Sequence, residues 1–199
     1  MRSMHRIITV VSLLVVLALF GCASSPPATT YYLLRGERAE RTERVDATIR
    51  AGLARVVVAP YLLSSPGIMV ETGEGQINPA SHYKWAEPLD AGLRWYLQTE
   101  IAAEMGVELG GGLTDRRNWE YSVDVLVAQL HGTMTGMALM QATFIIVPAD
   151  SSSEISEYRF MKSIPLPREG YAGVVEAEKT LLREFAGLIA DTLRERMDP

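Results

Sequence analysis

Three stretches in the second half of the chain have the character of long strands, two of them with alternating apolar and polar residues, and this pattern most restricts the possible folds. They begin at Tyr121, Thr135 and Tyr158, with turns predicted near Gly132 and at residues 150–153. Because successive side chains of a strand point to opposite faces, a period of two predicts strands with one buried face. Short connections favour antiparallel pairing of successive strands. We therefore expect a three-stranded antiparallel meander.

Two further segments have the period of an amphipathic helix. Pro88 opens the first, because the N–H that proline lacks would have no partner at that position, and Gly106 is suited to end it. The second runs from Tyr171 to Met197. The predicted buried positions are Leu89, Leu93, Tyr96, Leu97 and Ile101 in the first helix, and Val174, Leu181, Phe185, Leu188 and Leu193 in the second. The predicted solvent-facing side of the second helix contains Glu176, Glu178, Lys179, Arg183, Glu184, Asp191, Arg194 and Glu195.

Shorter strands are predicted in the first half of the chain. They cover residues 31–34, residues 53–59 (which Pro60 terminates) and residues 68–70, and a hairpin turn at residues 73–75 follows. Residues 35–50 are rich in charge and are predicted to form a solvated connection or a ragged helix. The whole pattern predicts an α+β fold, a mostly antiparallel sheet with two amphipathic helices packed on one face.

The N-terminal residues have the layout of a secretory signal. Arg2 and Arg6 precede residues 7–20, a run of fourteen residues that only Thr9 and Ser12 interrupt. A membrane-spanning helix needs about 20 apolar residues, so this run is too short to span and suits a signal peptide. We assign residues 1–21 to a signal peptide, residues 22–30 to a flexible tether and residues 31–199 to a single domain.

The signal ends in Gly21-Cys22, which resembles a bacterial lipobox. The resemblance implies diacylglycerol on the Cys22 thiol, cleavage before Cys22, and a fatty acyl group, typically palmitate, on the new amino terminus. One acyl chain binds a membrane only marginally, whereas two or three anchor a protein stably. Ala23 in such lipoproteins suggests export to the outer membrane, with the body in the periplasm. The alternative is an ordinary signal peptide with an incidental cysteine.

Charge and cysteine content exclude several classes of function. Removal of residues 1–21 takes away two arginines and no acid, so the charge of the chain changes from −5 to −7. An acidic body is poorly suited to phosphate backbones, so nucleic acid is not an expected partner. The single cysteine excludes an intrachain disulfide and a thiolate zinc cluster.

The chain contains no recognisable catalytic constellation. His82 and His131 are far apart in sequence and are interpreted as structural or surface residues rather than metal ligands. There is no G-x-S-x-G elbow and no nucleotide-binding loop of the Walker type, and residues 110–112, three glycines, are predicted to form a flexible loop. We therefore predict a protein with no catalytic residues, no metal and no cofactor.

Two features admit a functional interpretation. The segment from Tyr83 to Pro88 combines aromatic residues with a helix-initiating proline. It is interpreted as a structural corner in which Trp85 fills the edge of the core and Glu87 complements the helix N-terminus; alternatively, Tyr83, Trp85, Glu87 and Pro88 form a partner-binding edge. Four methionines near the meander are predicted mainly to fill the core, although methionine also lines adaptable binding surfaces. They are Met134, Met137, Met140 and Met161.

Several landmarks together resemble the ABC-type transport auxiliary lipoprotein family, which includes the PqiC-like proteins. They are the lipobox Cys22, the YYLL run at residues 31–34, the VVVAPY run at residues 56–61 and the HYKWAEPL run at residues 82–89. The resemblance implies a non-enzymatic outer-membrane lipoprotein of an envelope lipid-transport system. Its implied partners are an MCE-domain protein, the inner-membrane permease of that system and further copies of itself.

Two other classes of function stay open on the sequence alone. A lipid-binding carrier lipoprotein would need a dry pocket between the sheet and the helices. A lipid-anchored hydrolase would need a polar catalytic triad that the local sequence does not reveal.

Overall fold

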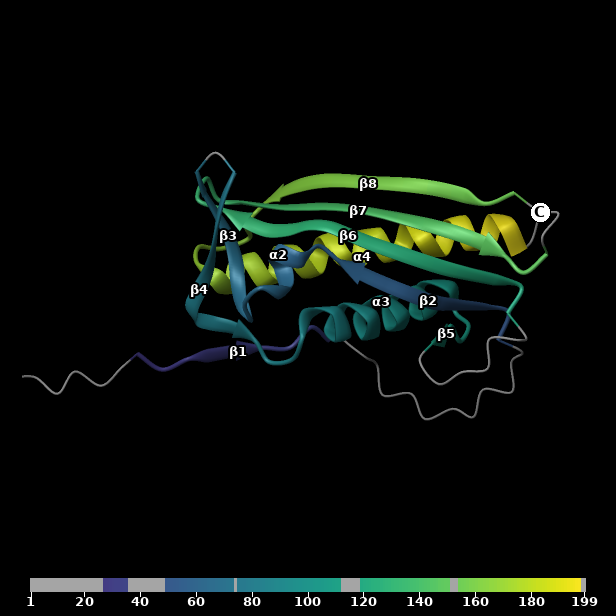
Figure 1. The fold of residues 1–199 in the computed structure, drawn as a ribbon, viewed down its shortest axis with the longest axis horizontal. Helices are drawn as coiled ribbons and strands as arrows, with labels where there is room; N and C mark the ends of the chain where they lie inside the picture. The colour runs from purple at the N-terminus through teal and green to yellow at the C-terminus, as the bar shows by residue number, and fades with distance from the viewer. Residues whose placement is uncertain (1–26, 36–48, 74, 112–118, 151–153, 198–199) are drawn as a thin grey trace, which may run out of the picture.

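The computed structural model describes residues 27–35, 49–73, 75–111, 119–150 and 154–197. Eight strands form one mixed, mostly antiparallel sheet, and helices α3 and α4 pack against each other and against one face of it (Figure 1). This confirms the predicted α+β fold. The strands are β1 (Thr30–Tyr32), β2 (Ala51–Val58), β3 (Gly67–Gly73), β4 (Gln76–Trp85), β5 (Gly110–Gly111), β6 (Tyr121–Thr133), β7 (Met137–Pro148) and β8 (Ser156–Pro165). The helices are α2 (Pro60–Leu63), α3 (Leu89–Met105) and α4 (Tyr171–Met197).

Strand β6 organises the sheet because it pairs with three other strands. Along one side it pairs antiparallel with β7, which in turn pairs antiparallel with β8, as the predicted meander requires. Along the other side it pairs parallel first with β2 and then, near its end, with β3. The predicted turn near Gly132 is displaced: Gly132 lies within β6, and the turn ends at Gly136, whose φ of 78° is easily reached only by glycine.

The remaining strands extend the sheet outward from β3 and from β2. Antiparallel β4 pairs with β3, and β1 then pairs parallel with β4, so β1 forms an outer edge. Short β5 pairs parallel with β2. Residues 110–112 were predicted to form a flexible loop, and this is wrong for Gly110 and Gly111, which are buried in β5; Gly112 lies outside the described residues. Glycine is needed at Gly110 because the indole of Trp119 occupies the space of a side chain there.

Helix α3 follows its sequence prediction closely. Pro88 is the N-cap, Gly106 ends the helix with a left-handed φ of 69°, and all five predicted buried positions are buried. A glycine in that conformation avoids the steric penalty that a Cβ atom would suffer. The predicted core face of α3 is therefore confirmed.

Helix α4 has the predicted bounds, but two of its positions were assigned to the wrong side. Glu178 is only 2% exposed, whereas Leu188 is 38% exposed. The burial of Glu178 follows because α4 packs on the sheet and on α3 at once, which widens its buried arc. Glu178 lies one turn after buried Val174 and three residues before buried Leu181, and therefore falls inside that arc.

The core between the sheet and α4 is filled by aromatic side chains. Phe144 of β7 stacks on Tyr158 of β8 with ring centres 4.8 Å apart and meets Phe185 of α4 edge-on at 5.8 Å. The prediction that the methionines fill the core holds for Met140, which is fully buried. It is wrong for Met134 and Met161, which are 72% and 74% exposed. Met134 lies in the β6–β7 turn. Met161 points away from the helices because successive side chains of β8 alternate between the two faces of the sheet.

Candidate functional site

The segment predicted to bind a partner forms the corner where β1, β4 and α3 meet, and we call residues 83–88 the corner. Two backbone hydrogen bonds fix its path: the Trp85 N–H donates to the Pro66 carbonyl at 2.8 Å, and the Ala86 N–H donates to the Tyr32 carbonyl at 2.8 Å. Tyr32 and Trp85 are also register partners in the parallel β1–β4 pair. The corner therefore connects the edge strand near the N-terminus to the start of α3.

An ion pair holds the end of β1 on the corner. The guanidinium of Arg35 donates hydrogen bonds from both terminal nitrogens to the Glu87 carboxylate, one of them at 2.8 Å. The same guanidinium lies 4.5 Å from the centre of the Trp95 ring. The hydrogen bond from Arg35 lowers the pKa of Glu87 below its usual value. A bidentate pair of this kind fixes geometry as well as charge, and arginine suits the ring contact through its planar face.

Tyr83 connects the corner to the last helix. Its ring stacks on that of Tyr171, the first residue of α4, with centres 4.6 Å apart and an angle of 21° between the planes. Tyr83 is 38% exposed despite this contact. One face of the ring is thus packed while the rest of the side chain remains available to solvent.

The four predicted partner-binding residues therefore differ in accessibility. Trp85 is 6% exposed and belongs to the core, and the carboxylate of Glu87 is held by Arg35. Tyr83 and Pro88 are exposed to solvent. The structure brings all four into one corner but presents mainly Tyr83 and Pro88 at its surface.

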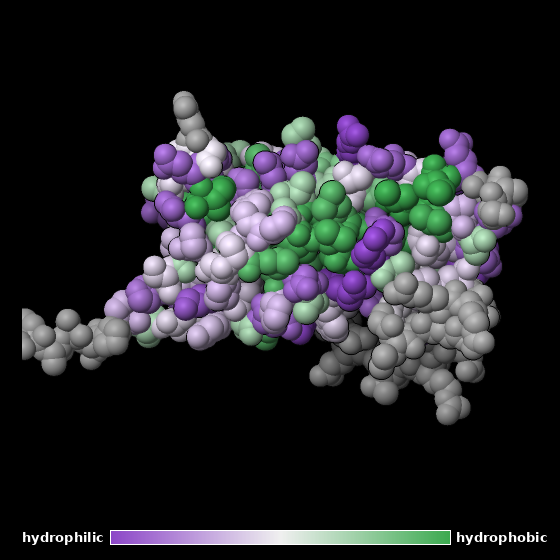
Figure 2. Space-filling model, viewed as in Figure 1, coloured by the Kyte–Doolittle hydropathy of each residue, from purple (hydrophilic) through white to green (hydrophobic). Residues whose placement is uncertain are grey.

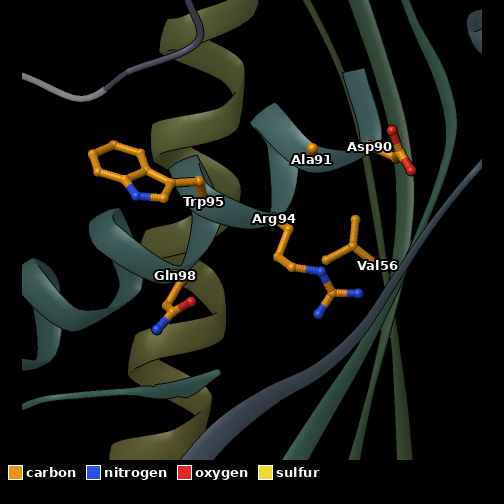
Figure 3. A pocket seen from close by; sticks show the side chains of 6 residues that line it. All are labelled: Val56, Asp90, Ala91, Arg94, Trp95 and Gln98. Carbon is orange, nitrogen blue, oxygen red and sulfur yellow. The ribbon is translucent and has the colours of Figure 1, made fainter. Parts of the chain in front are cut away.

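A cavity of about 390 Å³ lies beside the first turns of α3 (Figure 3). Val56 of β2 supplies apolar lining, and Trp95 lines the cavity from the α3 side. Asp90, Arg94 and Gln98 give it a polar, charged character. Arg94 also donates to the Ala54 carbonyl at 3.4 Å, so its guanidinium is directed toward β2. The lining of the cavity thus combines apolar and polar groups.

The outer face of the sheet carries an apolar area (Figure 2). Val57 of β2 and Leu126 of β6 are register partners on this face and are 43% and 44% exposed. Their neighbours Val56 and Val125 point to the opposite, buried side. The alternation that fills the core thus also leaves adjacent valine and leucine side chains in contact with solvent.

Sequence analysis missed a group of titratable side chains around buried His131. The Tyr61 hydroxyl lies 3.2 Å from Nδ1 of His131, and Nε2 of His131 lies 3.8 Å from a Glu71 carboxylate oxygen. Burial lowers the pKa of His131, which is only 4% exposed. Burial also raises the pKa of Glu178 to about 8. The sequence signal for Glu178 was its spacing from Val174 and Leu181, which overrides its polar character.

The described residues offer neither a metal site nor a membrane-spanning helix. Within the ranges given above, His, Cys, Asp and Glu side chains form no group of three that could hold a metal ion. No helix among those ranges is long and apolar enough to cross a membrane. His82 is partly exposed on β4, away from the buried His131. Cys22 lies outside the described residues, so its lipidation stays a prediction.

Comparison with known protein families shows to which family the chain belongs. The family model described as the ABC-type transport auxiliary lipoprotein component matches residues 31–190. The chain belongs to this family. The match begins at the residue where the folded domain was predicted to begin, and it includes the corner, both long helices as far as residue 190, and the whole meander. The predicted family is therefore confirmed, and with it the general role of a transport auxiliary component.

Solved structures share the fold of this transport auxiliary lipoprotein. The crystal structure of an uncharacterized protein is 19% identical, with a TM-score of 0.69, and the match covers 84% of this chain and 99% of the other. A protein from Xanthomonas campestris assigned to the DUF330 family is 16% identical, with a TM-score of 0.61 and coverage of 81% and 92%. No curated protein sequence matches the chain. At these identities the structures establish the fold alone.

Proposed function

We propose that this auxiliary lipoprotein is a non-enzymatic outer-membrane subunit of an MCE/ABC-type envelope lipid-transport system. Lipid on Cys22 anchors it to the outer membrane with its body in the periplasm. The domain docks onto an MCE-domain protein and so connects the transport conduit, which begins at an inner-membrane permease, to the outer membrane. It acts as a homo-oligomer.

The family match over residues 31–190 carries this proposal. It defines a transport auxiliary role for the folded domain, and the lipobox at Cys22 supplies the attachment. A subunit that positions other components needs a rigid body, a tether and exposed contact surfaces. The packed α+β domain supplies the rigid body and the exposed surfaces, and residues 22–30 are the predicted tether.

The corner is the proposed docking surface for the MCE-domain protein. Aromatic residues with partly exposed rings contribute strongly to interfaces, and Tyr83 is already held in place by its stack on Tyr171. Pro88, which is also exposed, ends the corner as the N-cap of α3, and its ring fixes the backbone φ. Buried Trp85 shapes this surface from beneath rather than contacting the partner.

Co-purification of an MCE-domain protein of the same envelope tests the docking surface. The lipidated wild-type chain is expected to retain the MCE protein, and the Tyr83→Ser variant with Pro88→Ala is expected to retain at least tenfold less. Leu188→Ser, which changes a residue of equal exposure on α4, is the matched control. Failure of the wild-type chain to retain the MCE protein would overturn the proposed function. Equal retention by the wild type, the double variant and the control would exclude the corner from the interface.

The apolar area around Val57 and Leu126 is the proposed self-association surface. A Leu126→Glu substitution would place a charge in each copy of a contact made by apolar side chains, and unpaired buried charge strongly disfavours association. We expect the wild type to elute as an oligomer in detergent and the variant as a smaller species. Identical masses would exclude this face as the contact.

A lipid-binding carrier is not favoured by the described part of the structure. The space between the sheet and the helices holds the side chains of Phe144, Phe185, Leu181 and Leu93, all fully buried. The cavity beside α3 is lined in part by Asp90 and Arg94. We therefore make the docking subunit the single functional proposal.

A further inference from the structure

Tyr31 in edge strand β1 and Leu33, which follows this strand, form an exposed apolar pair. Tyr31 is 63% exposed and Leu33 is 51% exposed, while Leu34 between Leu33 and the corner is fully buried. Residues two apart in an extended chain lie on the same face. Tyr31 is the register partner of Lys84 in the parallel β1–β4 pair, so these two side chains also share that face. We call Tyr31, Leu33, His82 and Lys84 the edge face.

The edge face differs in charge from the rest of the protein. Residues 27–35 and 75–86 contain no aspartate or glutamate, and they include Lys84; the other cation, Arg35, is paired with Glu87. The chain after residue 21 carries a net charge of −7. The nearest acid in sequence, Glu87, is already bound by Arg35. An apolar strip that carries the Lys84 ammonium and no acid has a local charge that anionic phospholipid headgroups complement, although the body as a whole is acidic.

The tether restricts how far this face can be from a bilayer. Thr30, the first residue of β1, follows Cys22 by eight positions. An extended chain spans at most ~3.6 Å per residue, so a lipid on Cys22 keeps β1 within roughly 30 Å of the membrane surface. Strand β1 lies at the lower left of the molecule, at one end of its long axis (Figure 1). The edge face is thus at the end of the molecule nearest the anchor.

We propose that the edge face rests on the anionic phospholipid surface of the membrane to which Cys22 is attached. Tyr31 and Leu33 enter the headgroup region, and Lys84 contacts lipid phosphates. Tyrosine favours this depth because its ring is apolar and its hydroxyl is polar. The contact rests on the proposed lipid anchor, and it orients the body so that Tyr83, which alternates to the other face of β4, stays free for a partner.

A nitroxide label tests this contact in the lipidated full chain. Cys22 is the only cysteine and is acylated in the mature protein, so Leu33→Cys introduces the single free thiol. The chain is reconstituted into vesicles of phosphatidylethanolamine with phosphatidylglycerol, and collision rates with oxygen and with a water-soluble nickel chelate are measured. The matched control is Val107→Cys, whose side chain is 45% exposed beyond the far end of α3.

The label at residue 33 is expected to be at least fivefold less accessible to the nickel chelate than the label at residue 107. Adding Lys84→Glu, or replacing the vesicles by phosphatidylcholine, is expected to remove most of this difference. Equal accessibility at residues 33 and 107 would overturn the proposal, and so would protection that survives both changes, since it would not require an anionic surface. Flotation of the chain with the vesicles is measured separately. A chain that does not float has no working anchor, which would overturn both proposals. A chain that floats while its edge face stays in water would overturn only the membrane contact.

Discussion

The indole ring of Trp119 occupies the position that a side chain at Gly110 would need. A Cβ atom on Gly110 would lie 2.4 Å from Cε2 and Nε1 of that ring, and one on its register partner Gly52 would lie 2.3 Å from the ring. Trp119 itself is only 4% exposed. The absence of side chains at the two glycines therefore leaves the space that the buried Trp119 ring occupies at the β2–β5 edge of the sheet.

Gly110→Ala is expected to destabilise the domain because the backbone of a short strand and a buried indole must move apart. Overpacking of a close-packed site costs about 1–3 kcal/mol. The free energy of unfolding in urea, followed by circular dichroism, measures the effect. Combining Gly110→Ala with Trp119→Leu should recover part of the loss in a double-mutant cycle. Additive losses would show that the ring and the glycine do not compete for the same space.

The same site shows where sequence analysis reaches its limit. Helix α4 could be predicted from Tyr171 to Met197 because its periodicity is local, and the meander could be predicted because alternation is local. Gly110 and Gly111 could not, because the reason for glycine is a ring that the fold brings to them. Three adjacent glycines have the composition of a loop, and only the pairing of β5 with β2 gives them another role.

The candidate site shows the same division between local and tertiary information. The sequence of the corner drew attention to Tyr83, Trp85, Glu87 and Pro88, and the start of α3 at Pro88 was confirmed. The contacts that distinguish these residues are made by Arg35 and Tyr171, which are far away in sequence. No periodicity or spacing identifies such partners. Burial of Glu178 was missed because a helix that packs on two surfaces has a wider buried arc than one that packs on a single sheet.

Glu178 is expected to contribute a loss of stability to the domain as pH rises. Burial raises the pKa of this carboxyl from 4.5 to about 8, so the folded chain keeps a proton that the unfolded chain releases. Stability is then lost progressively between pH 4.5 and 8, by a total on the order of 5 kcal/mol. Glu178→Gln, a neutral side chain of the same shape, should flatten this dependence and make the variant more stable than the wild type at pH 8. Parallel curves for the two proteins from pH 5 to pH 8 would contradict the assignment.

Arg35→Lys is expected to loosen β1 from the corner without unfolding the domain. Lysine keeps the charge but loses the two-point contact with Glu87 and the planar contact with Trp95. A partly exposed pair of this kind contributes about 0.5–1 kcal/mol. The pKa of Glu87 is lowered in the fold, so the wild-type contribution is present above the ordinary glutamate pKa and is lost as pH falls below it. Hydrogen exchange of the Ala86 amide, which donates to Tyr32, should be faster in the variant at pH 7. Unchanged exchange there would show that the ion pair does not hold the strand.

Mass spectrometry of the mature chain, combined with labelled palmitate in growing cells, tests the account most directly. We predict that the mature protein begins at Cys22, carries diacylglycerol on the thiol and an amide-linked acyl chain, incorporates the label and fractionates with the outer membrane. Cys22→Ser should abolish labelling. An unlabelled wild-type chain that osmotic shock releases into the soluble fraction would contradict the account.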